Sequence, residues 1–260
     1  MNVVFIVLGA LIMVFISFPL LKTVLSPSPG TMWNTLLQDE VYYSILLTIC
    51  AAVIATLFGL LFGVPLAYLL ARRNFRGKRL LEGLIDVPIV IPHSAAGVAL
   101  LFVFGQQFLL GKVFHVIGID FFNTIAGVII AMMFVSLPFL IDSARDGFQG
   151  VDVKLEKVAR TLGASPWRSF FRVSLPLAAR SIFSGSVMMW ARGISEFGAI
   201  LILAYHVPFL GHNPMVAPLL VADRFNYGLD YTLPVAGLVI LISLVIFIAL
   251  RMIAYRGDRA

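Results

Sequence analysis

The chain has 260 residues, of which 60% are hydrophobic and only 12% are charged, and its mean hydropathy is +1.01. An ordinary soluble domain carries about twice that share of charged residues, so the composition excludes a soluble enzyme. A bilayer core about 30 Å thick requires about 20 apolar residues per helix. The length therefore suits a single integral membrane domain covering 1–260.

Uncharged or nearly uncharged stretches predict an all-α membrane domain with six spans. We place the spans near residues 2–21, 42–71, 84–105, 122–141, 181–205 and 231–253. Pro88 and Pro92 in the third span remove backbone hydrogen bonds, which predicts a kink or a break. Gly59 and Gly63 in the second span have the spacing that lets another helix approach closely.

The distribution of Lys and Arg predicts the orientation of these spans. With both termini in the cytoplasm, five basic residues in 72–80, seven in 142–180 and three after 250 face inward, and three face outward. Cytoplasmic segments of membrane proteins carry this excess of Lys and Arg. We therefore expect a multi-pass protein of the cell membrane, and the net charge of +6 requires no nucleic-acid partner.

Motifs for covalent chemistry are missing from the sequence. The segment nearest to a phosphate-binding loop, Gly105 to Lys112, has five residues between its glycines instead of four, and Val113 replaces the hydroxyl residue. The four histidines have no spacing typical of a metal site. We expect no catalytic residue, no metal and no cofactor in this chain.

The inner segment 142–180 contains an amphipathic helix. Leu155, Val158, Ala159 and Leu162 recur at helical spacing and form one apolar stripe, with charged residues opposite. Gly163 suits a left-handed helix terminus.

A second short helix is predicted to follow this turn, and one ion pair is predicted before it. Ser165 and Pro166 supply an N-cap and a first helical residue, and Glu156 and Arg160 have the spacing of an ion pair. Two interpretations of the stripe stay open. It packs on the ends of the protein's own spans, or it lies in a groove on a cytoplasmic partner.

These residues resemble the permease subunits of binding-protein-dependent ABC importers of type I. Their cytoplasmic loop has the pattern E-A-A, three residues, Gly, nine residues, Ile-x-Leu-Pro. Here Gly163 is followed by nine residues and then by Val173, Ser174, Leu175 and Pro176, whereas Lys157, Val158 and Ala159 replace the first triplet. Two further segments, 91–97 (IPHSAAG) and 190–199 (WARGISEFGA), resemble molybdate/tungstate permeases, and sulfate and thiosulfate permeases have similar motifs.

The resemblance implies a pore subunit and not an enzyme. Its expected partners are a second copy of the chain, two cytoplasmic ABC ATPases that bind ATP and Mg, an extracytoplasmic oxyanion-binding protein, and membrane lipid. The inner loop would be a coupling helix that contacts the ATPase through Leu155, Glu156, Val158, Ala159, Arg160, Leu162, Gly163, Ala164, Ser165 and Pro166. The cargo would be molybdate or tungstate, with sulfate or thiosulfate as the alternative.

Charged residues also lie inside the predicted fifth span. Arg192 and Glu196 are four residues apart, so they can pair on one face of a helix. Such a pair either fixes helix packing or forms part of a polar passage. The candidate pathway or gate residues are Pro92, His93, Ser94, Arg192, Ser195 and Glu196. An ion-coupled secondary transporter is a further alternative, although no internal inverted repeat is visible.

Overall fold

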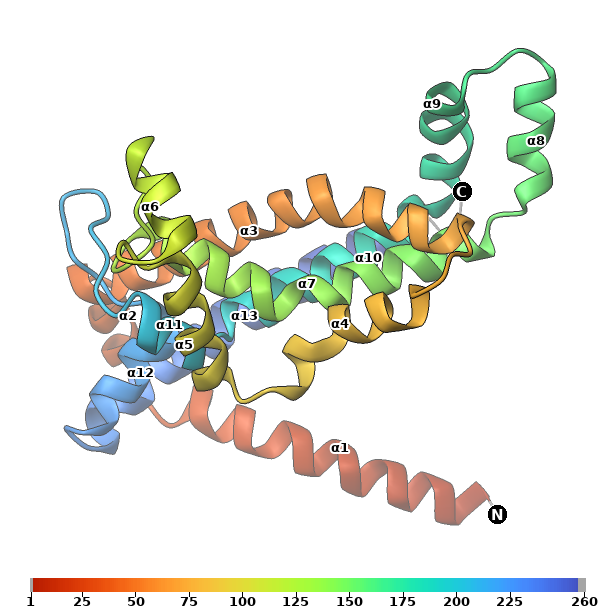
Figure 1. The fold of residues 1–260 in the computed structure, drawn as a ribbon. Coiled ribbons are helices and arrows are strands. Elements are labelled where there is room, and N and C mark those ends of the chain that lie inside the picture. Colours follow the sequence, from red (N-terminus) through yellow and green to blue (C-terminus); the bar gives the residue numbers. More distant parts are fainter. Residues whose placement is uncertain (1, 257–260) are drawn as a thin grey trace.

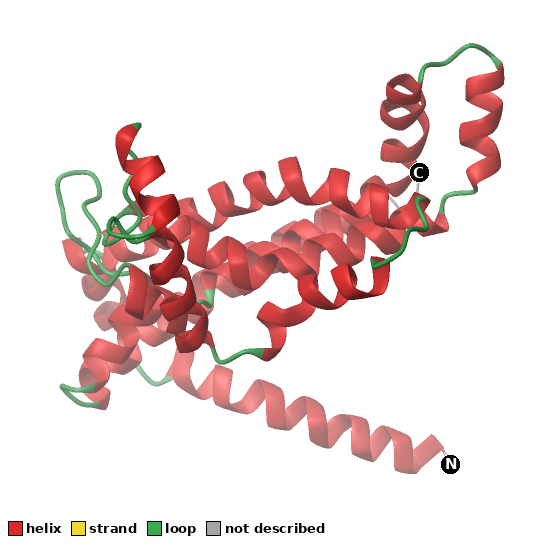
Figure 2. Ribbon diagram, in the orientation of Figure 1, coloured by secondary structure: helices red, strands yellow, loops and turns green. Residues whose placement is uncertain are grey.

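The computed structural model describes residues 2–256, and within this range the regular elements are helices (Figures 1 and 2). The all-helical fold class is confirmed. Four helices among the described residues are long and apolar enough to cross a membrane. They are α1 (Asn2–Leu25), α3 (Asp39–Arg72), α7 (Ile125–Gly150) and α13 (Leu229–Arg256).

The third predicted span is broken, as its two prolines indicated. α4 (Lys78–Val90) and α5 (His93–Phe104) meet at a bend of 115°. The break lies at Ile91 and Pro92, which have extended ψ angles of 147° and 131°. Together these two helices form either one broken span or a re-entrant segment.

The fifth predicted span, 181–205, is wrong as a single helix. α10 (Leu175–Ile194) ends before Ser195, and α11 (Gly198–Leu203) begins three residues later. The Glu196 carboxylate accepts a hydrogen bond from the Ala199 backbone N–H, so it satisfies the start of α11. With four long helices and one bent pair, the count of six spans stays a prediction.

The inner segment is more helical than the predicted loop 142–180. α7 runs on to Gly150, and α8 (Val153–Thr161) and α9 (Pro166–Ser169) project from one end of the molecule (Figure 1). A π-helical stretch, η1 (Phe170–Ser174), then leads directly into α10. α9, η1 and α10 therefore follow one another without a break.

Helices α3, α7 and α10 pack against one another to form the centre of the bundle (Figure 1). A Cβ atom added at Gly59 would lie 2.5 Å from Met189, and one at Gly63 would lie 3.2 Å from Leu137. The two glycines of α3 thus permit close contact with α7 and α10 of the same subunit.

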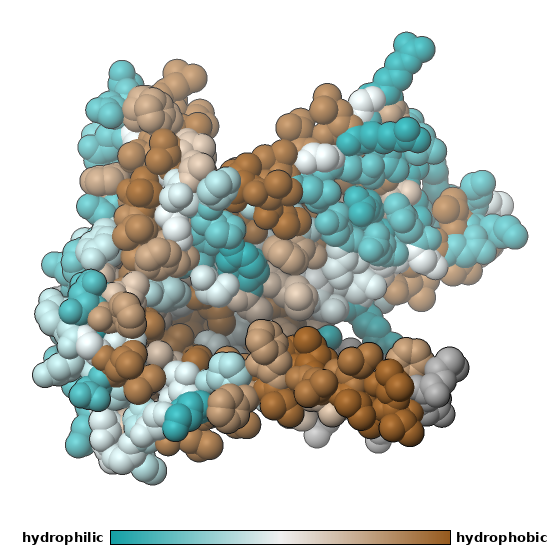
Figure 3. Space-filling model, turned by 90° about the horizontal axis from the view of Figure 1, so that it is seen from below, coloured by the Kyte–Doolittle hydropathy of each residue, from teal (hydrophilic) through white to brown (hydrophobic). Residues whose placement is uncertain are grey.

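The end opposite α8 is closed by short helices (Figure 1). They are α2 (Pro29–Leu36), α6 (Leu109–Val116), α11 and α12 (Ala217–Phe225). Leu219 and Leu220 are buried where α12 packs on α3 and α13. Hydrophilic side chains are most frequent toward the two ends of the molecule, as expected for a membrane protein (Figure 3).

Candidate functional site

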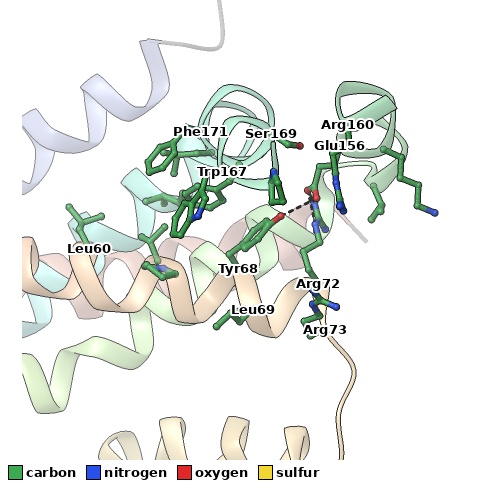
Figure 4. A pocket seen from close by; sticks show the side chains of 18 of the residues that line it. Leu60, Tyr68, Leu69, Arg72, Arg73, Glu156, Arg160, Trp167, Ser169 and Phe171 are labelled. Carbon is green, nitrogen blue, oxygen red and sulfur yellow. Dashed lines mark hydrogen bonds and ion pairs between the residues drawn. The ribbon is translucent and has the colours of Figure 1, made fainter. Parts of the chain in front are cut away.

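The first candidate site is α8, which is held in place by a buried carboxylate. Glu156 is only 9% exposed. Its carboxylate accepts hydrogen bonds from the Tyr68 hydroxyl (3.1 Å), the Arg72 Nε (2.8 Å) and the Ser174 hydroxyl (2.8 Å). Tyr68 and Arg72 come from α3 (Figure 4), and Ser174 comes from η1. We call this group of four residues the Glu156 anchor.

Arg72 contributes more than one bond to the Glu156 anchor. Its Nη2 lies 2.7 Å from a Glu156 carboxylate oxygen and also donates to the Val151 carbonyl at 3.0 Å. The guanidinium therefore joins the end of α3 to both sides of the turn that precedes α8. The predicted ion pair between Glu156 and Arg160 is wrong, because the carboxylate points into the protein and is satisfied there.

The apolar stripe of α8 faces away from the protein. Leu155 is 49% exposed, Val158 57% and Leu162 83%. The stripe therefore does not pack on the protein's own span ends. A helix that turns its buried carboxylate inward and its leucines to solvent has the reverse of the usual arrangement, and exposed apolar surface of this kind marks an interaction site.

The ends of α8 and α9 are fixed by local capping. Asp152 accepts a hydrogen bond from the Lys154 backbone N–H at the start of α8. Gly163 has φ +89°, as its sequence position predicted. Ser165 accepts from the Arg168 N–H, with Pro166 in the first helical position. The predicted helix, turn and second helix are thus confirmed as local structure.

The second candidate site lies where α5 and α11 meet, at the two helix breaks. Arg192 Nη2 lies 2.9 Å from a Glu196 carboxylate oxygen and 2.9 Å from His93 Nε2. Ser195 accepts a hydrogen bond from Arg192 Nη1 at 3.3 Å. We call His93, Arg192, Ser195 and Glu196 the pathway cluster.

The chemistry of the pathway cluster follows from its hydrogen bonds. Arg192 can only donate, so His93 Nε2 is the acceptor of the hydrogen bond between them. Glu196 is fully buried, whereas the Arg192 side chain is 21% exposed and that of His93 is 42% exposed. The cluster thus presents donors to one open side, backed by a buried negative charge.

Two glycines bring the broken helices close enough to form this cluster. A Cβ atom at Gly198 would lie 2.7 Å from the His93 Cβ, and one at Gly97 would lie 2.8 Å from the Ala199 carbonyl oxygen. Neither position leaves room for a larger residue. Pro92 and Ser94 flank His93 at the start of α5 and are exposed, so all six predicted pathway residues lie at or beside the two breaks.

Sequence reasoning missed the partners of Glu156. Tyr68, Arg72 and Ser174 are 88, 84 and 18 residues away from it. The available signals were weak: an arginine at the end of a long apolar stretch, and a serine inside the Val-Ser-Leu-Pro segment. No group of His, Cys, Asp or Glu in the described part of the chain is arranged to hold a metal ion.

Comparison with known proteins identifies the family. Residues 59–258 match the model of the binding-protein-dependent transport system inner membrane component. The molybdate/tungstate transport system permease protein WtpB of Pyrococcus furiosus is 45% identical over 97% of this chain and 95% of its own length. The probable sulfate transport system permease protein cysT of Chlorokybus atmophyticus is 36% identical over 85% of this chain and 77% of its own.

A solved structure supports the fold. A chain of a bacterial alginate ABC transporter, crystallised in complex with an alginate-bound periplasmic protein, aligns with a TM-score of 0.76. The alignment covers 100% of this chain and 96% of that chain, at 15% sequence identity. The described helices therefore have the arrangement of an ABC importer permease.

Proposed function

Since this chain belongs to the family of binding-protein-dependent transport system inner membrane components, we propose that it is the membrane subunit of an ATP-driven importer of molybdate and tungstate. The cargo follows from the relative that is 45% identical over nearly the whole chain. The permease forms the passage, and separate ATPase subunits bind ATP and Mg and hydrolyse the nucleotide. The chain itself performs no covalent chemistry.

The observation that carries the coupling role is the outward apolar stripe of α8. Leu155, Val158 and Leu162 are exposed on a helix whose opposite face is bonded to the protein. A partner with an apolar cleft would bury this stripe, as amphipathic helices are commonly bound. We assign that partner to the ATPase subunit.

The Glu156 anchor gives the ATPase a mechanical connection to the spans. Arg72 lies at the end of α3, and Ser174 lies directly before α10. A displacement of α8 is therefore passed to two central helices of the bundle and not absorbed in a flexible loop. Rigid movement of packed helices is a common form of switching between inward and outward opening.

The pathway cluster is the proposed passage for the anion. Molybdate, tungstate and sulfate each carry two negative charges, so a site for transit needs donors without a deep electrostatic trap. Arg192 supplies the donors, and Glu196 and His93 moderate its positive charge. A released anion can bind here weakly and leave.

The proposed assembly has two copies of this chain, two ATPases inside and an anion-binding protein outside, with both termini of each copy in the cytoplasm. A symmetric pair of permeases would enclose the passage between them. Sulfate stays the second candidate cargo, because a relative named as a probable sulfate permease is 36% identical. Family membership argues against the ion-coupled secondary transporter.

ATP hydrolysis in proteoliposomes tests this proposal. The chain is reconstituted with its ATPase, and the binding protein is added without anion or loaded with molybdate, tungstate or sulfate. We expect molybdate and tungstate to stimulate hydrolysis and the unloaded protein to have little effect. Stimulation by sulfate alone would reassign the cargo. Failure of the ATPase to assemble, with uptake that follows an ion gradient, would overturn the ABC function.

A further inference from the structure

A groove of about 920 Å³ lies between the inner half of α3 and the segment formed by α8, α9 and η1 (Figure 4). Val153, Glu156, Lys157 and Arg160 of α8 line it. These four positions share one face of the helix, opposite the apolar stripe. Glu156 and Arg160 were expected from the sequence among the ATPase contacts, but they lie on this groove face, and the exposed stripe assigned to the ATPase lies on the opposite face.

One part of the groove is apolar and open. Leu61 is 62% exposed, Trp167 73% and Phe171 56%, although all three line the groove. The Trp167 and Phe171 rings stack with their centroids 6.1 Å apart. From Leu60 to Leu69, α3 rises about 14 Å, which is about the hydrocarbon depth of one leaflet.

The other part of the groove is cationic. Arg73, Lys157 and Arg160 are exposed and line it, and none of them has an ion-pair partner within residues 2–256. The carboxylate of Glu156 is already satisfied by Tyr68, Arg72 and Ser174. Three cations without an acidic partner thus line a groove whose other lining residues are mostly hydrophobic.

We propose that this groove binds one anionic phospholipid of the cytoplasmic leaflet. Its phosphate lies among Arg73, Lys157 and Arg160, and an acyl chain lies along α3 against Trp167 and Phe171. Basic pockets beside membrane helices on the inner side bind such headgroups. The assignment rests on the proposed function, which places α8 on the cytoplasmic side of the membrane.

A second copy of this chain fits the groove less well. Its exposed apolar helix, α1, carries no acidic residue and would leave the three cations without a counter-charge. An anionic lipid satisfies both parts of the groove at once. The bound lipid would also connect α3 to α8 beside the Glu156 anchor, so the lipid composition would influence how firmly the coupling helix is held.

Quenching of Trp167 fluorescence by brominated lipids tests the assignment. The full chain, with W33F and W190F leaving Trp167 as the single tryptophan, is placed in nanodiscs with its ATPase. Dibromo-phosphatidylglycerol and dibromo-phosphatidylcholine are titrated separately. We expect half-maximal quenching at a lower mole fraction of the anionic lipid, by about fivefold for each contributing cation. Trp190 is buried, so W190F can disturb the packing around it. In that case the spectrum of a W167F variant is subtracted from that of the unaltered protein, which isolates the signal of Trp167.

Matched charge variants decide whether the groove is responsible. R73Q/R160Q should narrow the difference between the two lipids to about fivefold, because Lys157 is the one cation of the three that remains in the groove. R76Q/R79Q removes two exposed cations of the neighbouring segment that do not line the groove, and it should keep the preference. Equal quenching by both lipids in the unaltered groove, or no quenching by either, would overturn the proposal. Co-purification of the ATPase in the same samples reports separately on the coupling function.

Discussion

Two arginine–glutamate pairs occupy the two candidate sites, and they differ in how the chain builds them. Arg72 and Glu156 are 84 residues apart and meet at 2.7 Å, joining α3 to α8. Arg192 and Glu196 are four residues apart and meet at 2.9 Å across a helix break. In both pairs the glutamate side chain is nearly inaccessible, at 12% and 1% exposed.

The Arg72–Glu156 pair joins two distant elements, whereas the Arg192–Glu196 pair shapes one helix break, so we expect different roles for them. The long-range pair joins α8 to α3, in addition to the contacts that α8 makes with α9 and η1. The short-range pair shapes the break between α10 and α11, where Glu196 also accepts the Ala199 N–H. Loss of the first pair should therefore disconnect α8 from the spans, and loss of the second should change the passage.

Removal of the anchor carboxylate should have the largest effect on stability. Glu156→Ala leaves the Arg72 guanidinium, whose side chain is 10% exposed, without its counter-ion. Breaking a buried pair in this way costs about 3 kcal/mol or more. We expect the melting temperature of the purified protein to fall by about 10 °C and ATP hydrolysis to lose its response to loaded binding protein.

The matched control for this variant is Glu40→Ala, which breaks an exposed pair with Arg224 at the other end of the molecule. Such pairs contribute about 1 kcal/mol or less, so its melting temperature should change little. Equal melting temperatures for the two variants would show that the Glu156 anchor does not hold α8.

Removal of the pathway cation should have a smaller effect on stability and a strong effect on transport. Arg192→Ala leaves the buried Glu196 with His93 and the Ala199 N–H as remaining neighbours. We expect a cost of about 2 kcal/mol, less than for an unpaired buried charge, because the Ala199 N–H still donates to the carboxylate, and we expect the ATPase to stay assembled. Uptake of molybdate and co-purification of the ATPase are measured separately. Normal uptake by an assembled complex would end the pathway assignment.

The two pairs also differ in whether the sequence predicted the partner of the glutamate. The spacing of Arg192 and Glu196 predicted their pairing, which is confirmed, although Glu196 lies beyond the end of α10 and the two residues do not share one helical face. The same rule assigned Glu156 to Arg160 and was wrong. Tyr68, Arg72 and Ser174 compete for that carboxylate, and tertiary contacts of this kind leave no periodic signal.

The two helix breaks also differ in whether the local sequence predicted them. Pro88 and Pro92 predicted the break in 84–105, because proline removes a backbone donor. The break at Ser195–Phe197 has no proline or turn motif, and the apolar residues on both sides suggested one continuous span. Its cause is tertiary, since Gly198 must lie against His93 of another helix.

Crowding at the pathway cluster should produce an intermediate effect. In Gly198→Ala the new Cβ would lie 2.7 Å from the His93 Cβ and 3.0 Å from the Ser94 nitrogen, so α5 and α11 must separate. Overpacking of this kind costs about 1–3 kcal/mol. Gly83→Ala in α4 is the control, because no atom lies within 4 Å of its added Cβ. We expect reduced uptake and a lower melting temperature for the first variant only; equal behaviour would contradict the close approach.

The smallest change in stability is expected on the outward stripe of α8, where the Glu156 anchor is left intact. Leu162 is 83% exposed, and surface substitutions usually change stability by about 0.5 kcal/mol or less. Leu162→Ser should therefore melt like the unaltered protein and yet bind the ATPase more weakly, because the partner loses an apolar contact. Leu109→Ser on α6, where the leucine is 81% exposed, removes the same side chain at the opposite end and should leave ATPase binding unchanged. Co-purification of the ATPase over a concentration series measures the difference. Equal binding by both variants would mean that the stripe presented by α8 is not the surface that the ATPase contacts, even if the buried pair behind it holds the helix in place.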